Sequence, residues 1–346
     1  MARSPIIPAA TESPVSKVKL AERNGTFQIR KVLTSIIDWP MAALQRLVGE
    51  RGMAYVFLLP NLIFFGLFVF VPLGINILYS ATGGAALFPA DRPYVGLDQY
   101  GYLFDCGSYI DPNTCREDHF WRGVTNTFNF TMFQVVTMVV LSLLTAIVLN
   151  MKIRGRGFFR AVYFFPVLLS PVVVALIWKW ILQRDGLLNA LITSLGGEKI
   201  LFLNEPGWAT FWIVFVSVWS HMGFYTLILL AGLQAIPADI YEAAEMDATP
   251  RWRVFWRLTL PLLWPNLIVV VVLALIRAVQ TFDEVFVLTG GGPGTATLMV
   301  VQYIYETAFS NQVQNFGLAA AASVVLGVVL FALTLIQLAF TRRKTS

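Results

Sequence analysis

Residues Glu242 to Pro261 read Glu-Ala-Ala-Glu-Met-Asp-Ala-Thr-Pro-Arg-Trp-Arg-Val-Phe-Trp-Arg-Leu-Thr-Leu-Pro, and they lie between two long apolar segments. The stretch is charged and rich in good helix formers, in a chain of 346 residues that is 57% hydrophobic and 13% charged. Soluble domains are about 45–50% apolar and about 25% charged. Together with a mean hydropathy of +0.68, this composition indicates a membrane protein in which the stretch is a loop outside the lipid.

Six apolar segments are long enough to cross a bilayer, which takes about 20 residues of helix. The predicted spans are roughly 54–80, 124–150, 158–182, 208–233, 258–279 and 317–340. They lack the strict apolar–polar alternation of membrane barrel strands. Because backbone polar groups in lipid must be satisfied within the segment, the sequence predicts an all-α membrane protein with six transmembrane helices.

The termini flank this six-helix domain, residues 54–340. Residues 1–53 are expected to form a cytoplasmic arm, and residues 341–346 a cytoplasmic tail. Large apolar residues recur at loosely helical spacing among basic residues over 26–50, which predicts an N-terminal interfacial helix interrupted at Pro40; a disordered basic arm is the alternative. We expect no cleavable signal peptide, because no early apolar run is present and the first span can serve for targeting.

Lys and Arg residues predict the orientation. One side carries Arg3, Lys17, Lys19, Arg23, Arg30, Lys31, Arg46, Arg51, Lys152, Arg154, Arg156, Arg160, Arg251, Arg253, Arg257, Arg342, Arg343 and Lys344. The opposite loops carry only Arg92, Arg116, Arg122, Arg184 and Lys199, while Lys179 and Arg277 fall inside predicted spans. The richer side is expected to be cytoplasmic, with both termini inside. Since basic residues border the spans, lipid is an expected partner and nucleic acid is not.

The long loop over 81–122 contains both cysteines, Cys106 and Cys115. It lies on the predicted oxidising side, where a structural disulfide is plausible chemistry. Metal ligation with Asp118 and His119 is the alternative, but the spacing matches no known ligand pattern. We therefore predict a disulfide and no metal.

Motifs for catalysis are missing from the sequence. There is no G-x-x-x-x-G-K-[ST] phosphate loop, and the glycine run 290–294 lacks the required Lys and Ser/Thr. His221 stands alone on an apolar face, where a packed or hydrogen-bonded helix residue is expected. We predict that the chain is not an enzyme.

The stretch 242–261 resembles the coupling loop of binding-protein-dependent ABC importer permeases, in which a transport subunit contacts its ATPase. The resemblance implies coupling roles for Glu242, Ala243, Ala244, Asp247, Ala248, Phe255, Leu260 and Pro261. We expect a two-helix cytoplasmic elbow over 237–261. Its first helix would begin around Glu242 and present the paired alanines as a thin face, and its second would begin with Thr249 as N-cap and Pro250 at the first position.

One position departs from the family pattern. Ala248 stands where the family usually has glycine, and alanine resists the positive φ that glycine allows. Two alternatives follow: either the break between the two helices is not left-handed, or Thr249-Pro250 makes the break instead.

A second resemblance covers residues 281–294 and 303–309, which are similar to the carbohydrate branch of these importers. The glycine run resembles that of the first permease subunit in maltose-type and glycerol-phosphate-type systems, and the two resemblances together cover roughly 54–340. They imply a bacterial inner-membrane subunit that transports a sugar, oligosaccharide or polyol. The implied partners are a second permease, two ATP-binding subunits that hold ATP and Mg, and an extracytoplasmic solute-binding protein. No cofactor is implied for this chain. A secondary transporter and a non-transporting scaffold are the alternatives.

The substrate path is expected where span five ends, at Gln280, Phe282, Asp283 and Glu284. Charged residues at membrane depth usually face a cavity, although both carboxylates could instead face water among the headgroups. Arg277 precedes Glu284 by seven residues, or about 10 Å of helix, so we expect no direct pair and take Thr281 as its neighbour. A second polar set, Asn126, Asn129 and Gln134, is explained equally well by helix packing.

Overall fold

The computed structural model describes residues 41, 44–46, 48–151, 154–310 and 314–342, and it divides into two units, residues 1–74 and 75–346. Residues 1–40 and 343–346 lie outside the described residues. The predicted interfacial helix over 26–50 falls mostly outside them, as does most of the predicted tail, 341–346.

The first span is a 33-residue helix, Val48–Ser80, most of which belongs to the first unit. It contains a π-helical turn, η1 (Gly66–Phe70), followed by α2 (Val71–Ser80). Pro72 has no amide N–H, and its ring would clash with the carbonyl four residues earlier. The widened turn that ends two residues before Pro72 is a common way for a helix to accommodate such a ring.

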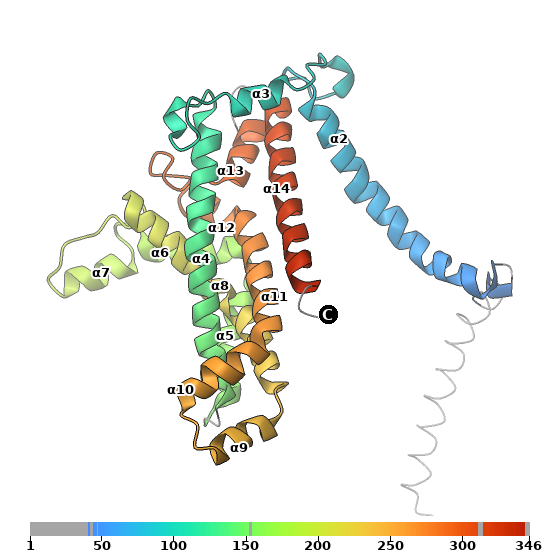
Figure 1. Ribbon diagram of the computed structural model, residues 1–346. Coiled ribbons are helices and arrows are strands. Elements are labelled where there is room, and N and C mark those ends of the chain that lie inside the picture. Colours follow the sequence, from blue (N-terminus) through green and yellow to red (C-terminus); the bar gives the residue numbers. More distant parts are fainter. Residues whose placement is uncertain (1–40, 42–43, 47, 152–153, 311–313, 343–346) are drawn as a thin grey trace, which may run out of the picture. The chain divides into compact units, whose positions relative to one another are not determined.

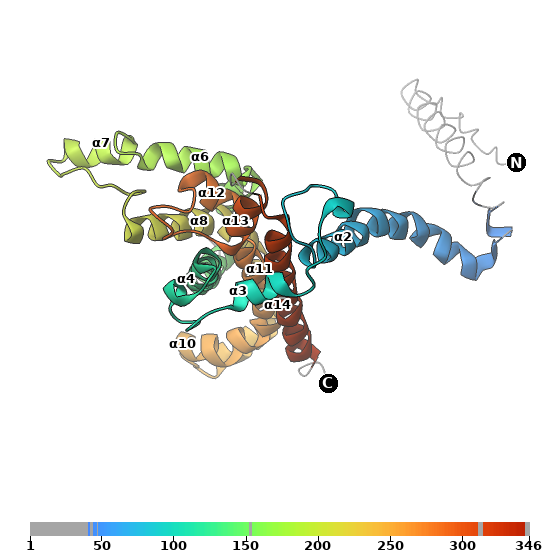
Figure 2. The same ribbon diagram turned by 90° about the horizontal axis from the view of Figure 1, so that it is seen from above.

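Three long helices form the core of the second unit: α4 (Asp118–Asn150), α8 (Pro206–Gln234) and α11 (Leu260–Val279). They pack against one another, and α14 (Phe316–Arg342) lies beside α11 (Figures 1 and 2). Fully buried side chains join the three helices, among them Phe130, Met138, Ile213, Leu229, Leu263 and Val270. Because lipid is as apolar as these residues, van der Waals packing between close helices stabilises the bundle.

The third span in the structure differs from the prediction. It is not one helix over 158–182 but a pair bent by 99°: α5 (Arg156–Phe164) with η4 (Phe165–Leu168), then α6 (Pro171–Leu182). Pro166 and Pro171 donate no backbone hydrogen bond, and a residue before proline is driven out of the helical region. Ser170 is accordingly extended, with ψ 136°. A further helix, α7 (Leu187–Ser194), follows α6.

The described residues thus contain five helices long and apolar enough to cross a membrane, or six if the bent pair counts as one span. Two isolated β-bridges are the only strand-like pairings among them. The predicted all-α class is therefore confirmed for the part of the chain that the structure describes.

The segment before α4 is short and irregular. It contains η2 (Pro89–Asp91), α3 (Asp98–Phe104) and η3 (Pro112–Thr114), and Cys106 is bonded to Cys115. Arg92 is buried in it, where Nε donates to Oγ1 of Thr82 at 2.8 Å and Nη1 donates to the carbonyl of Ala86 at 2.7 Å. Burial lowers the pKa of the Arg92 guanidinium, and these hydrogen bonds, with the ring of Tyr79 5.0 Å from the guanidinium carbon, offset part of the cost of burying the charge.

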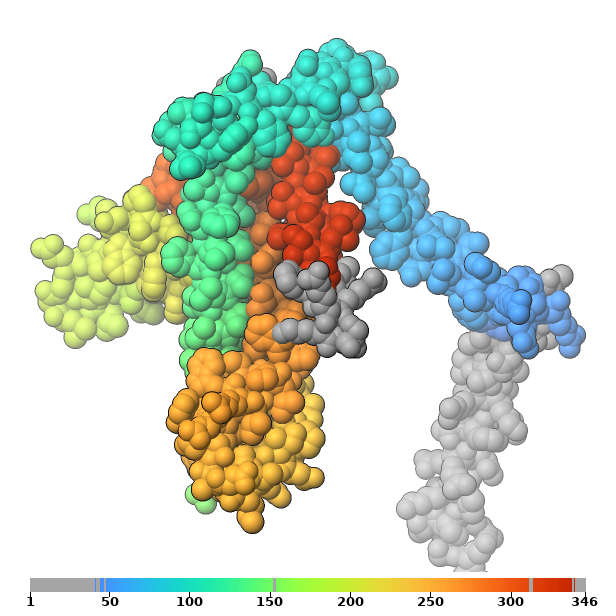
Figure 3. Space-filling model, in the orientation of Figure 1, coloured from blue at the N-terminus to red at the C-terminus, as the bar shows by residue number. Residues whose placement is uncertain are grey.

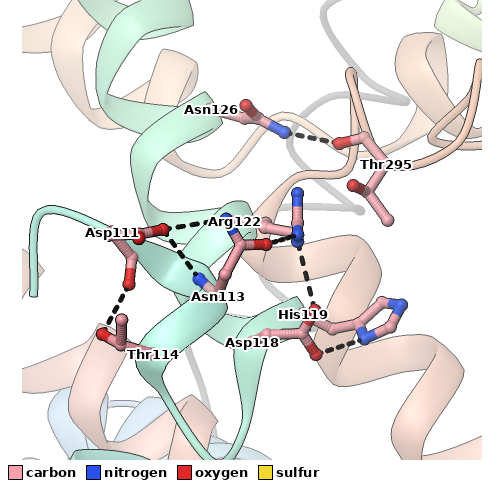
Figure 4. Close-up of polar contacts among 8 residues, drawn as sticks. All are labelled: Asp111, Asn113, Thr114, Asp118, His119, Arg122, Asn126 and Thr295. Atoms are coloured by element: carbon pink, nitrogen blue, oxygen red, sulfur yellow. Dashed lines mark hydrogen bonds and ion pairs between the residues drawn. The ribbon is translucent and has the colours of Figure 1, made fainter. Parts of the chain in front are cut away.

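The start of α4 is tied to η3 by polar contacts (Figure 4). Arg122 Nε lies 3.2 Å from Oδ2 of Asp118, and the same guanidinium donates to Asn113. His119 Nδ1 lies 3.0 Å from Oδ1 of Asp118. Among the described residues no group of three or more His, Cys, Asp or Glu could hold a metal ion.

The opposite end of the bundle from α3 is formed by α9 (Ala238–Met246), α10 (Arg251–Val254) and the π-helical turn η5 (Phe255–Thr259). Figure 3 shows these elements, in yellow and orange, projecting beyond the end of α4. The loop 237–261 and the segment before α4 therefore lie at opposite ends of the second unit.

Candidate functional site

The elbow between α8 and α11 begins earlier than predicted. Helix α9 starts at Ala238, so Glu242 lies in its middle. Glu242 and Ala243 are exposed, whereas Ala244 is only 8% exposed. Successive helix residues point about 100° apart, and on α9 this turns Ala243 outward and Ala244 inward. The predicted paired-alanine face is therefore wrong: Ala243 is open to a partner, and Ala244 packs inside the elbow.

Helix α9 ends in a Schellman motif. The amide of Thr249 donates to the carbonyl of Ala244 at 3.0 Å, and the amide of Ala248 donates to the carbonyl of Glu245 at 3.0 Å. Ala248 has φ 50°, and it is the only non-glycine residue with positive φ in the described part of the chain. This is the left-handed position that glycine usually fills. The break is therefore left-handed in spite of the alanine, and the alternative of a Thr-Pro break without it is wrong.

The second arm of the elbow is the beginning of span five. Pro250, rather than Thr249, occupies the N-cap of α10, so the predicted cap is displaced by one residue. From Arg251 the helix continues through η5 and α11 to Val279. Leu260 and Pro261 lie in its course, and Phe255 is half-buried. Tyr241 Oη on α9 lies 3.2 Å from Oγ1 of Thr259, so the first arm is joined directly to the span.

Two cavities adjoin the elbow. One, of about 660 Å³, is lined by the end of α4 and by Tyr241, Ala248 and Phe255. The other, of about 580 Å³, lies between α9 and η5 and is lined by Ala243, Ala244 and Asp247. Five of the predicted coupling residues thus line one or other of the two cavities: Ala243, Ala244, Asp247, Ala248 and Phe255. Glu242 is exposed on α9, and Leu260 and Pro261 lie at the beginning of α11.

The four predicted path residues of span five line a single pocket. Helix α11 ends at Val279, three residues follow, and α12 (Asp283–Leu288) begins. A cavity of about 230 Å³ lies at this break, lined by Leu273, Ile276, Arg277, Gln280, Thr281, Phe282, Asp283 and Glu284. The non-helical backbone at this break thus lines a cavity, the setting in which irregular backbone is tolerated inside a membrane.

Glu284 forms a contact that the sequence argument excluded. Arg277 Nη2 lies 3.5 Å from Oε1 of Glu284, whose side chain is 5% exposed. The expected 10 Å separation is wrong because α11 ends at Val279 and the chain changes direction before α12. The hypothesis that both carboxylates face water is also wrong for Glu284; Asp283 is the exposed one. The hydroxyl of Thr281 donates to the backbone carbonyl of Arg277 at 3.2 Å, and not to its guanidinium.

His221 on α8 completes this cluster. Its Nδ1 lies 2.9 Å from the carbonyl of Ser217, which can only accept, so Nδ1 carries the proton. The unprotonated Nε2 then accepts from Arg277 and lies 3.7 Å from Oε1 of Glu284. The expected hydrogen-bonded role of His221 is confirmed, but its place beside the pair of exposed Arg277 and buried Glu284 was not predicted.

The second polar set lies away from this pocket, on α4. Asn126 Nδ2 donates to the carbonyls of Thr295, at 2.8 Å, and Leu298, at 3.0 Å (Figure 4). Gln134 is buried and donates Nε2 to Oγ of Ser217 at 3.0 Å, and Asn129 is exposed. Gln134 thus joins α4 to α8, which is the packing role considered for this set, whereas Asn126 joins α4 to the loop between α12 and α13.

Arg277, His221 and Lys179 are site residues that the sequence argument did not assign. Lys179 on α6 donates Nζ to the carbonyl of Val287, in the last turn of α12, at 2.8 Å. A usable signal was present: Lys179 and Arg277 are the two basic residues inside predicted spans, and a charge at membrane depth requires a partner.

Comparison with known proteins identifies the family. Residues 138–346 match the model of the binding-protein-dependent transport system inner membrane component. The chain belongs to this family. The family resemblance seen in residues 242–261 is thereby confirmed.

Similar curated proteins include the trehalose/maltose transport system permease protein MalF of Thermococcus litoralis, 33% identical over 290 residues, which are 84% of this chain and 93% of that protein. The multiple sugar-binding transport system permease protein MsmF of Streptococcus mutans is 31% identical over 301 residues, 86% of this chain and 98% of that protein. A solved bacterial ABC transporter involved in alginate import contains a chain with the same fold, with a TM-score of 0.73, 23% identity, and coverage of 88% of this chain and 100% of that one.

Membership of the family makes the chain a permease subunit of a binding-protein-dependent ABC importer, a multi-pass inner-membrane protein that works with a periplasmic binding protein and ATPase subunits. Nucleotide is bound by the ATPase partner, and the permease is not a catalytic subunit. The secondary-transporter and scaffold alternatives are therefore set aside.

Proposed function

We propose that the chain is the first permease subunit of a bacterial carbohydrate importer, and that the break between α11 and α12 forms its part of the translocation path. The observation that carries this proposal is the 230 Å³ pocket, which gathers Gln280, Phe282, Asp283 and Glu284. It combines hydrogen-bonding side chains with an aromatic ring. A sugar needs both, because its hydroxyl groups form hydrogen bonds and its ring packs against an aromatic face. Relatives named for trehalose/maltose and multiple-sugar transport support the substrate class.

The volume of the pocket supports a second permease as partner. Ligand pockets usually measure about 300–1,000 Å³, and the pocket on this chain is smaller. One wall therefore holds part of a sugar or polyol, and a different permease subunit supplies the facing wall. A thermal-shift screen of the soluble binding protein against sugars would identify the substrate.

The elbow is the proposed contact with one of two ATP-binding subunits. Glu242 and Ala243 offer an exposed helical face, and the hydrogen bond between Tyr241 and Thr259 joins that face to span five. Because Arg251–Val279 is one continuous helix, a displacement of α9 reaches the pocket at Gln280 along a single element. ATP-driven closure of the ATPase pair would then change the shape of the path.

The orientation follows from the same assignment. We place the elbow, both termini, the arm 1–53 and the tail 341–346 in the cytoplasm, and the segment with the disulfide outside. The excess of Lys and Arg on the elbow side supports this, as does the position of the disulfide at the opposite end of the bundle.

The proposal is tested by sugar uptake into proteoliposomes that hold the complete transporter and its loaded binding protein. Removing one partner of a buried hydrogen bond typically costs about 1–3 kcal/mol, and about 1.4 kcal/mol is a factor of ten. Gln280 and Asp283 are exposed in the isolated chain, but a hydrogen bond from either to a bound sugar would be buried. Gln280→Ala and Asp283→Ala should therefore slow uptake roughly tenfold, whereas the control Glu198→Ala, outside the pocket, should not. Parental rates in both pocket variants would reject this path and favour Asn126, Asn129 and Gln134.

A further inference from the structure

Helix α12 is held at both ends by charged side chains from two other helices, α11 and α6. At its start, Glu284 contacts Arg277 of α11 and His221 of α8. At its end, the carbonyl of Val287 accepts from Lys179 of α6 at 2.8 Å. Helix α12 also packs closely against α6. The element that begins with the pocket residue Asp283 is therefore bound to α11 and α6 by polar contacts, and His221 of α8 positions Arg277 through the hydrogen bond that its Nε2 accepts.

The contact at the end of α12 satisfies a requirement of both partners. The last four carbonyls of a helix lack intrahelical donors, and a cation is favoured at that end. The half-buried ammonium of Lys179, for its part, lies among apolar residues of α6 and needs a polar partner. The carbonyl of Val287 is that partner. The bond consequently joins the bent third span to the end of α12.

Little else in the backbone fixes α12. It has six residues, and helices this short are marginal on their own. The chain reverses directly after it, with positive φ at Gly290, Gly291 and Gly294. Its position is therefore determined by side-chain packing of Val285 and Leu288, which are buried, and by the polar contacts at its ends.

We propose that Lys179 is a positioning residue for transport: its hydrogen bond holds α12 so that Asp283 and Phe282 line the pocket. Lys179 itself does not line the pocket and acts through α12. The inference rests on the proposed path at the break between α11 and α12. If Lys179 only satisfied its own charge, its removal would leave the position of the start of α12 unchanged.

The test compares Lys179→Met with Lys179→Arg in the complete transporter. Methionine keeps the length and loses the donor, and arginine keeps a donor of similar reach. The matched control is Lys199→Met, since Lys199 pairs with Asp185 at the surface. We expect Lys179→Met to lower uptake five- to tenfold, Lys179→Arg to remain within twofold of the parent, and the control to be unchanged. Size-exclusion chromatography checks that each complex assembles.

A second measurement reports the position of α12 without using sugar. Asp283→Cys is labelled with a membrane-impermeant maleimide in the parental and Lys179→Met backgrounds; Cys106 and Cys115, joined in a disulfide, do not compete. We expect the labelling rate to change at least threefold on loss of Lys179. Equal rates overturn the positioning role, as does an uptake defect that arginine fails to restore. A labelling change together with normal uptake in Gln280→Ala and Asp283→Ala rejects the proposed path alone.

Discussion

Replacing Ala248 by glycine should stabilise the turn of the elbow. An L-residue in the left-handed region costs roughly 1–2 kcal/mol, and Ala248 adopts that region with φ 50°. Glycine removes this cost but loses about 0.4–1 kcal/mol through the greater freedom of the unfolded chain. The difference predicts that the closed turn of Ala248→Gly is more stable by about 0.5–1 kcal/mol.

Hydrogen exchange of the amides of Ala248 and Thr249 in the assembled transporter measures the opening of this turn directly, since both amides donate within it. Because about 1.4 kcal/mol is a factor of ten, Ala248→Gly should raise their protection roughly two- to fivefold. Ala248→Val should lower protection, because a β-branched residue with positive φ is a strong outlier.

The matched control is the same substitution on the same helix. Ala243 is exposed in the middle of α9, where glycine costs about 1 kcal/mol relative to alanine. Ala243→Gly should therefore lower protection where Ala248→Gly raises it. Unchanged or reduced protection in Ala248→Gly, or the same sign in both variants, would refute the assignment of strain to residue 248.

Three further outcomes are expected. Glu242→Lys or Ala243→Glu should insert normally but abolish binding-protein-stimulated ATP hydrolysis, and normal stimulation in either variant would remove α9 from coupling. Cys106 and Cys115 should resist alkylation until a reductant is added and then react only with reagents from outside; labelling from the cytoplasm would overturn the orientation. Gly223→Val should lower the thermal unfolding temperature of the complex, because any Cβ at this position collides with the backbone of Tyr163 and overpacking typically costs about 1–3 kcal/mol; an unchanged temperature would show that α5 yields freely.

Properties set by local composition could be predicted from the sequence. Five of the spans follow from apolar length alone, and the elbow follows from charge and helix-forming residues between two such spans. The third span could not be placed correctly by length, because its shape depends on Pro166 and Pro171. Both prolines are visible in the sequence, but a count of apolar residues does not register that proline lacks the backbone N–H that a continuous helix needs.

The sequence did not predict contacts that depend on where a helix ends. The separation of Arg277 and Glu284 was taken along one straight helix, and a break after Val279 brought them together. At Ala248 the local preference of alanine argued against a left-handed turn, yet the two hydrogen bonds of the Schellman motif outweigh it. In the first case a helix break, and in the second a pair of local hydrogen bonds, overrides a rule based on helix geometry or residue preference alone.

The π-helical turns have a mechanical consequence. In span one the turn Gly66–Phe70 precedes Pro72, and in span five the turn Phe255–Thr259 precedes Pro261, at the same interval. Bends in helices concentrate at prolines and π-bulges, so each span contains a compliant joint at a defined level. The joint in span five lies between the elbow and the buried part of α11. On the proposed coupling role of the elbow, a stroke delivered there would bend this helix near its base before it displaces the far end, and the stiffness of a single turn would set how much of the movement is transmitted.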